Sequence, residues 1–129
     1  MQWHVLVDIL ITSDDAVVLL RREDEDVWHL PGGPLVEMDD PAEVVKRLVQ
    51  EQVNLALEDV RLVWVEARNT QQGPTLVLHY EADAPGYPSP GPNIAETRLF
   101  QVEHLPTLDA ADREALYITL TGGDTFQPF

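Results

Sequence analysis

Residues 28–55 read WHLPGGPLVEMDDPAEVVKRLVQEQVNL, and this stretch determines the fold. Its two glycines, Gly32 and Gly33, stand between prolines, a composition that predicts a loop rather than regular structure. Asp40 and Pro41 then form a strong helix start, since Asp caps free N–H groups and Pro suits the first helical position. The stretch therefore predicts a glycine loop followed by a helix from Pro41 to about Val53.

The predicted helix is amphipathic. At about 100° per residue, one broad arc is aliphatic and carries Val44, Val45, Leu48, Val49 and Val53. The opposite arc carries charged residues four positions apart, which can pair along the helix: Glu43, Arg47 and Glu51. Periodicity alone favours a core helix with a solvated salt-bridge face. Gln52 does not fit that pattern, because it falls within the aliphatic arc and needs a buried partner.

Strand-like runs surround this helix. Each run is rich in β-branched and aromatic residues, which either alternate with other residue types or form a short apolar stretch. The runs lie at positions 3–12, 16–20, 60–67, 75–80 and 97–102. The first two runs predict a hairpin. A second helix is expected at 109–120, and the Pro- and Gly-rich segment 84–92 predicts a loop. This order predicts an α/β (α+β) fold, with helices packed on a mixed sheet, in a single domain over residues 1–129.

Composition excludes several classes of function. The chain of 129 residues is 44% apolar, has no cysteine and carries a formal charge of −15. Absence of cysteine excludes disulfides, thiolate catalysis and zinc–thiolate sites. The negative charge disfavours nucleic-acid polymers and anionic membranes, since both are bound through clustered Lys and Arg. No membrane-length apolar run or secretory signal is visible, so the cytoplasm is the expected location.

The segment resembles the box of the Nudix hydrolases. That family carries W-x-L-P-G, then G, five residues, E, seven residues, and R-E-U-x-E-E-x-G-U, where U is aliphatic. Residues 28–32 match the lead-in. Counted from Gly33 without a gap, Asp39 takes the first glutamate position, while Arg47 and Glu51 match the box.

Besides the conservative change at Asp39, three box positions depart from the family. Leu48 and Gln52 stand where the family has glutamates, and Asn54 replaces the late glycine. A second run, NIAETRLF at 93–100, resembles a family segment that precedes the last helix. The resemblance thus covers nearly the whole chain. It implies an α/β/α sandwich and metal-dependent hydrolysis of the pyrophosphate bond in a nucleoside diphosphate linked to another group.

The resemblance also implies site residues. Glu51 would be the main ligand of Mg²⁺ or Mn²⁺, with Glu37 and the neutral Gln52 as weaker candidates, so metal binding is expected to be weak or lost. Arg47 and Glu51 are the expected catalytic residues, with Glu96 as a candidate base. Alternatives remain: Glu37 as a solvated loop residue and Glu96 as a surface acid. The family's pairing pattern implies that Asp39 holds Arg47.

Substrate contacts are expected from Trp28, Gly32, Gly33 and Arg68. Trp28 has two interpretations, packing against the sheet or stacking on a base. The histidines show no metal-type spacing and are expected to be ordinary: His4, His29, His79 and His104. A homodimer is expected by resemblance.

Three hypotheses of function follow. The first is a Nudix-type hydrolase of a small nucleotide-like substrate with a reduced metal site. The second is a binding or regulatory module that holds a similar ligand, or a protein partner, without turnover. The third is an interaction domain without a small ligand. Intact lead-in residues favour the first, whereas the changes at Leu48 and Gln52 favour the second.

Overall fold

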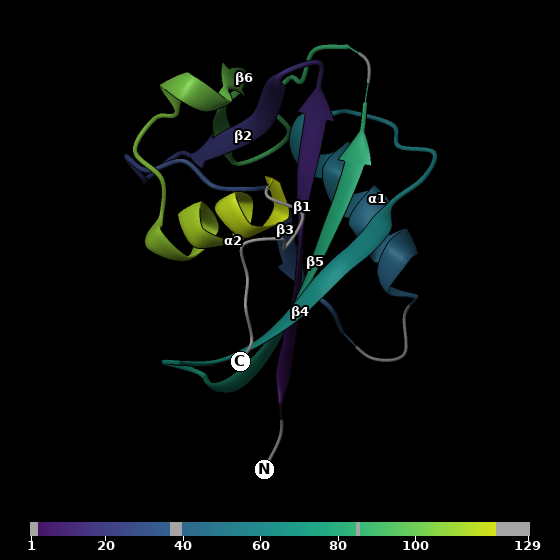
Figure 1. Ribbon diagram of the computed structural model, residues 1–129, viewed down its shortest axis with the longest axis vertical. Helices are drawn as coiled ribbons and strands as arrows, with labels where there is room; N and C mark the ends of the chain where they lie inside the picture. The colour runs from purple at the N-terminus through teal and green to yellow at the C-terminus, as the bar shows by residue number, and fades with distance from the viewer. Residues whose placement is uncertain (1–2, 37–39, 85, 121–129) are drawn as a thin grey trace.

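The fold is a mixed six-stranded sheet with one helix on each face (Figure 1). The computed structural model describes residues 3–36, 40–84 and 86–120. In chain order the elements are β1 (His4–Ser13), β2 (Ala16–Arg22), β3 (Gly32–Pro34), α1 (Pro41–Val53), β4 (Arg61–Thr70), β5 (Gly73–Asp83), β6 (Ile94–Gln101), the short 3₁₀ helix η1 (Val102–His104) and α2 (Ala110–Leu120). This architecture confirms the predicted α+β class.

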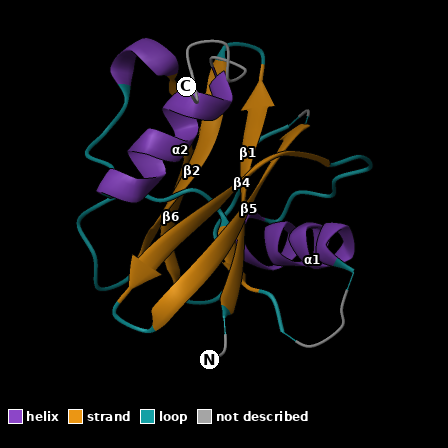
Figure 2. Cartoon of the chain, turned by 60° about the horizontal axis from the view of Figure 1, so that its bottom comes forward, coloured by secondary structure: helices purple, strands orange, loops and turns teal. Residues whose placement is uncertain are grey.

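Strand β1 is the centre of the sheet, whose order is β4-β5-β1-β2-β6. It runs parallel to β5 along nearly its whole length and antiparallel to β2 only at Thr12 and Ser13. Farther back along β1, residues 6–8 pair with β3 instead. The sheet therefore opens between β1 and β2, and β3 pairs with β1 there (Figure 1). Figure 2 shows α1 and α2 on opposite sides of the sheet.

The diglycine segment is a strand, and its prediction as a loop was wrong. Gly33 pairs with Val7, and Gly32 pairs with Asp8, in an antiparallel ladder. A Cβ on Gly32 would lie 2.3 Å from the Val7 carbonyl oxygen, so only glycine permits this approach. The partner strand stands far away in the sequence, which is why local turn chemistry gave the wrong result.

Helix α1 has the predicted bounds, because its end signals are local. The Asp40 carboxylate accepts a hydrogen bond from the Ala42 N–H at 3.1 Å, and Pro41 occupies the first turn. Asn54 ends the helix in the left-handed region, with φ of 57°. This conformation explains why a glycine position tolerates Asn, the residue that adopts left-handed φ most readily after glycine.

Two apolar clusters separate the faces of the sheet. Val7, Ile9 and Ile11 of β1 pack with the valines of α1, whereas Leu10 packs on the other face with Leu116 of α2. This alternation follows from the two-residue period of a strand. The remaining strands match the predicted runs with shifted ends, and β4 and β5 are longer than predicted. No described helix has the length and hydrophobicity required to span a bilayer.

Candidate functional site

Glu51 and Arg47 lie on the exposed face of α1. The Arg47 Nε and the Glu51 Oε1 are 3.7 Å apart, and both side chains are more than half exposed. Glu51 lines an open hollow of about 630 Å³ at the end of α1, together with Gln52, Asn54, Arg22 and Asn93. We call this the helix-end hollow. The predicted pairing along the helix is present between Arg47 and Glu51, while Glu43 pairs with Lys46 at 3.4 Å.

Gln52 joins α1 to the diglycine strand. Its Oε1 accepts a hydrogen bond from the Gly32 N–H at 3.0 Å, and its Nε2 donates to the Gly32 carbonyl oxygen at 2.8 Å. The partner that this half-buried amide required is therefore the Gly32 peptide. An amide suits the position because it both donates and accepts, whereas an ionised carboxylate only accepts. The carbonyl oxygen predicted as a weak metal ligand is engaged by the Gly32 N–H.

Leu48 packs against the same strand from the next turn of α1. An ideal Cβ on Gly33 would meet the Leu48 methyl carbons at 3.5 and 3.6 Å, and Leu48 also contacts the core cluster beneath α1. The box position that carries a carboxylate in the family is thus an apolar contact here. Glu37 and Asp39 lie outside the described residues, so the expected roles of both stay predictions.

A second hollow, of about 170 Å³, lies on the other side of the diglycine strand. We call it the diglycine hollow. Its polar lining comes from five elements or loops and comprises Asp8, Arg22, His29, Arg68 and Asp112, beside Gly32 and Gly33. Three of the four predicted substrate-binding residues, Gly32, Gly33 and Arg68, are therefore brought together.

Two arginines bring positive charge to these hollows. Arg22, at the end of β2, lines both hollows and has no ion-pair partner among the described residues. Arg68 donates from one terminal nitrogen to Glu66, but its buried Nε has no hydrogen-bond partner among the residues that the structure describes. A buried N–H group of this kind normally has an acceptor, so the orientation of this guanidinium needs support from its neighbours.

Two histidines, expected to be ordinary, belong to charged networks. His79 is 1% exposed, with its Nδ1 2.7 Å from Asp8 Oδ1 and its Nε2 2.8 Å from Glu66 Oε1. Burial alone lowers the pKa of His79, but the two carboxylates outweigh it and the pKa is raised. Burial raises the pKa of Asp8, although His79 opposes that change.

His29 has a similar environment nearer the surface. Its Nδ1 lies 2.9 Å from Asp112 Oδ2, and its Nε2 lies 2.6 Å from Glu25 Oε2. The hydrogen bond with Asp112 is the main reason why the pKa of His29 is raised. Neither network could be predicted from the sequence, since His79 and Asp8 are 71 positions apart and His29 and Asp112 are 83 apart.

Trp28 and Glu96 lie elsewhere. Trp28 is 8% exposed and packs edge-on against Phe100 at 4.8 Å between ring centroids. The packing interpretation therefore describes it, since the stacking role requires an open ring face. Glu96 accepts hydrogen bonds from Arg21 on β2 and from Arg98 on its own strand, each at 3.0 Å. It lines neither of the two hollows.

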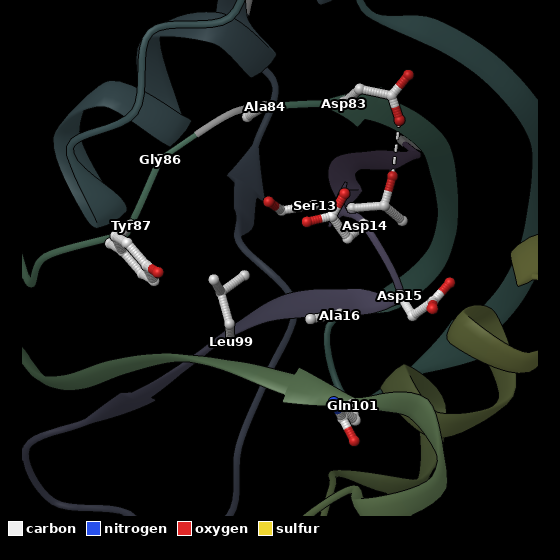
Figure 3. Close-up of a pocket in the computed structure, with 11 residues that line it drawn as sticks. Ser13, Asp14, Asp15, Ala16, Asp83, Ala84, Gly86, Tyr87, Leu99 and Gln101 are labelled. Atoms are coloured by element: carbon white, nitrogen blue, oxygen red, sulfur yellow. Dashed lines mark hydrogen bonds between the residues drawn. The ribbon is translucent and has the colours of Figure 1, made fainter.

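A third hollow, of about 680 Å³, lies beyond the β1–β2 turn (Figure 3). Asp14, Asp15 and Asp83 contribute carboxylates, and Tyr87, which is 86% exposed, stands at its edge. None of the described residues that line it is cationic. This lining repels phosphate, so size alone does not identify the functional site.

The described residues fit a firmly held divalent ion poorly. Around the helix-end hollow they offer the Glu51 carboxylate alone, while Leu48 is apolar and the Gln52 amide is bonded to Gly32. Mg²⁺ sites of this kind use one or two carboxylates and take further oxygens from substrate phosphates and water. Elsewhere the ligand atoms of His29, Asp109 and Asp112 lie within 4.8 Å of one another. These groups already have partners: His29 bonds to Asp112 and Glu25, and Asp109 accepts from the Ala111 N–H.

Comparison with known proteins identifies the family. A model of the NUDIX domain matches residues 2–120. An RNA pyrophosphohydrolase of Ectopseudomonas mendocina (strain ymp) is 32% identical over 72 residues, which cover 51% of this chain and 45% of that protein. The match therefore spans less than half of that relative.

Solved structures agree with the family match. A MutT NUDIX hydrolase from Burkholderia pseudomallei has a TM-score of 0.79 and 25% identity, covering 91% of this chain and 98% of that chain. A NUDIX hydrolase from Nitrosomonas europaea has a TM-score of 0.80 and 18% identity, covering 99% of this chain and 76% of that chain. Since the family model spans most of the sequence and the fold agrees, this chain belongs to the NUDIX domain family.

Proposed function

We propose that this NUDIX domain hydrolyses the pyrophosphate bond of a nucleoside diphosphate linked to another group, using a reduced metal site. The observation that carries the proposal is the meeting of two hollows at Arg22. One hollow contains Glu51, and the other contains Gly32, Gly33 and Arg68. A pyrophosphate lying across Arg22 would place its negative charge beside cations that have free hydrogen-bonding capacity.

Arg22 and Arg68 are the expected phosphate-binding groups. In a chain of charge −15, a phosphate ligand needs local positive charge, and both arginines supply it at the diglycine strand. Gln52 and Leu48 hold that strand against α1, so the hollows keep a fixed relation. The carboxylate of Glu51 faces solvent in the helix-end hollow, where it can orient a water or share an ion with the substrate.

A divalent ion, when bound, stabilises negative charge on phosphoryl oxygens. With one described carboxylate available, we expect the protein alone to bind Mg²⁺ or Mn²⁺ weakly and to bind it better when a diphosphate is present. Calorimetry with the metal alone and with a metal–diphosphate mixture tests this expectation. Tight binding of the metal alone would contradict the poor fit described above.

The decisive experiment is turnover by Glu51→Gln. Phosphate or nucleotide release is measured over a panel of nucleoside diphosphate derivatives, with Mg²⁺ or Mn²⁺. We expect Glu51→Gln to reduce kcat at least 100-fold, in the range seen when one charge-stabilising group is removed. The matched control is Glu43→Gln, which removes an exposed carboxylate from the same helix two turns earlier. Equal turnover by both variants would exclude Glu51 from the chemistry.

Binding without turnover is the second candidate. Leu48 packed over Gly33 and Gln52 bonded to Gly32 favour it, because both side chains stabilise the strand without a metal. This function predicts that a member of the same panel raises the melting temperature although no product forms. Arg68→Lys would then weaken the stabilisation, whereas Glu51→Gln would leave it nearly unchanged.

A further inference from the structure

His79 is the most buried ionisable side chain in the centre of the α2-facing sheet surface. It lies on β5, level with Asp8 on β1 and Trp64 on β4, and is 1% exposed. Its ring stacks on that of Trp64, with centroids 4.0 Å apart and planes 17° from parallel. Trp64 is itself fixed by donating a hydrogen bond from Nε1 to the Thr119 hydroxyl of α2 at 3.3 Å. The plane of the imidazole is therefore set by its surroundings.

Both ring nitrogens of His79 face carboxylates. Nδ1 lies 2.7 Å from Asp8 Oδ1, and Nε2 lies 2.8 Å from Glu66 Oε1. When both carboxylates are ionised they can only accept, so both ring nitrogens donate and the ring is an imidazolium. Removal of either proton would place a lone pair against a carboxylate oxygen in a buried site.

Glu66 carries the network on to Arg68. The same Oε1 that accepts from His79 also accepts from a terminal nitrogen of Arg68. Glu66 and Arg68 are two positions apart on β4, so both project from one face of the strand. The result is a chain of ion pairs, Asp8–His79–Glu66–Arg68, whose two ends both line the diglycine hollow.

We propose that His79 is a positioning residue for the diglycine hollow, holding Asp8 directly and Arg68 through Glu66. By this chain it fixes the direction in which the unpartnered Nε of Arg68 is presented. Without the imidazolium, the carboxylates of Asp8 and Glu66 would lose the cation that lies between them. The guanidinium of Arg68 would remain as the cation paired with Glu66. Glu66 would then be drawn toward other partners, and Arg68 would lose its fixed orientation. The inference rests on the proposed function only in taking the diglycine hollow as the place of substrate contact.

The first test needs no substrate. Nitrogen-15 spectra record each arginine Nε–H group, and the Arg68 signal is assigned by its loss in Arg68→Lys. In the unaltered protein we expect that signal to be protected from exchange with water, since the Nε is buried. In His79→Gln we expect it to move to the position of solvent-exposed arginines and to exchange faster. An Arg68 signal unchanged in folded His79→Gln would overturn the proposal.

Two controls separate positioning from a general loss of stability. Glu81→Gln removes the partner of Arg61, an ion pair on the same two strands, and should alter the Arg61 signal alone. His104→Gln replaces an exposed histidine and should alter neither signal. If His79→Gln does not fold, Glu66→Gln takes its place, since it keeps the side-chain shape and removes the charge that holds Arg68. An unchanged Arg68 signal in Glu66→Gln would equally overturn the proposal.

The second test uses the substrate found with the panel. We expect His79→Gln to raise KM, or the Kd of a ligand that is not turned over, roughly tenfold, with a smaller change in kcat. Because His79 acts through Arg68, the double variant with Arg68→Lys should be little worse than Arg68→Lys alone. Fully additive effects would overturn the proposal. If the unaltered protein neither binds nor hydrolyses any panel member, the proposed function fails, and the arginine spectra still decide the role of His79.

Discussion

Leu48 and Gln52 show how single residues change the use of the surface between α1 and the diglycine strand. Glutamates at these positions would direct two carboxylates toward the diglycine strand. Here Leu48 makes an apolar contact with Gly33, and Gln52 satisfies both the N–H and the carbonyl oxygen of Gly32. The Gln52 N–H group lies against the Gly32 carbonyl oxygen, where a glutamate would leave two oxygens facing each other. A cation or a proton would then be needed between them.

This reasoning predicts the behaviour of the double variant Leu48→Glu with Gln52→Glu. Without metal it should be less stable by roughly 2 kcal/mol, since an apolar contact is lost and the Gly32 carbonyl loses its donor. With Mn²⁺ the loss should be reversed, and the metal affinity should rise at least tenfold above that of the unaltered protein. Calorimetry and melting curves with and without Mn²⁺ measure both effects.

The control for added charge is Gln71→Glu with Gln72→Glu, two exposed positions in the β4–β5 turn. It adds the same two carboxylates far from α1 and should leave metal affinity unchanged. A double variant at Leu48 and Gln52 that folds normally and binds no Mn²⁺ would show that these positions do not face a common ion site.

At the scale of elements, the end of α1 is bonded to the loop that precedes β6. The Asn54 side chain donates to the Ser89 carbonyl oxygen at 3.0 Å, and the Gly91 N–H donates to the Gln52 carbonyl oxygen at 3.0 Å. These bonds satisfy free carbonyl groups at the helix end and loop. They also explain the choice of Asn over Gly at position 54, since glycine has no side chain to make the contact.

Gly91 is the critical residue of this junction. A Cβ there would lie 1.8 Å from the Glu51 carbonyl oxygen, which is backbone and cannot move aside without shifting the helix end. We expect Gly91→Ala to lower the free energy of unfolding by roughly 1–3 kcal/mol, as overpacking does elsewhere. The matched control is Gly33→Ala, whose Cβ would meet only the Leu48 methyl groups at 3.5 Å. Chemical denaturation that gave equal midpoints for both variants would contradict this account.

Sequence signals predicted elements well where the determinants are local. The bounds of α1 follow from Asp40, Pro41 and a helical period, all within a short window. The diglycine strand was missed because its determinant is a close approach to Val7 on another strand. For the same reason the sequence indicated Gly32, Gly33 and Arg68 as candidates but not Asp8 or His79, which join them only through sheet pairing.

On the scale of the whole molecule, the two charged networks connect the sheet to its surroundings. The His79 network joins β1, β4 and β5, whereas His29 joins the segment before β3 to Glu25 and to Asp112 of α2. The pKa values of His29 and His79 are both raised by their carboxylate partners, His79 in spite of its burial. The pKa of Glu66 is lowered, because hydrogen bonds from Arg68 and His79 outweigh its burial. Protonation and stability are therefore linked.

The signs of these shifts predict the pH dependence of stability. A histidine with a raised pKa contributes stability that is complete below its ordinary value of 6.5 and is lost as the pH rises through the folded-state value. Glu66 acts oppositely, contributing above its ordinary value of 4.5 and losing its contribution as the pH falls through the lowered value. The pKa of Asp8 is raised, so its contribution to stability is complete below its ordinary value of 3.8 and is lost as the pH rises through the folded-state value. We therefore expect a maximum of melting temperature on the mildly acidic side of neutrality.

The decline of the melting temperature at alkaline pH can distinguish the contribution of the two histidine networks from that of the overall charge. With a formal charge of −15, self-repulsion also grows when any histidine loses its proton. The loss of an imidazolium between two carboxylates belongs to His29 and His79, and the exposed His104 serves as the control. Melting curves between about pH 6 and about pH 9 should fall steeply for the unaltered protein and for His104→Gln. The fall in melting temperature should be shallower for His29→Gln and His79→Gln. Each variant lacks the ion pairs of one histidine, so it has less stability to lose as the pH rises. Parallel curves for all four proteins would assign the decline to charge repulsion alone.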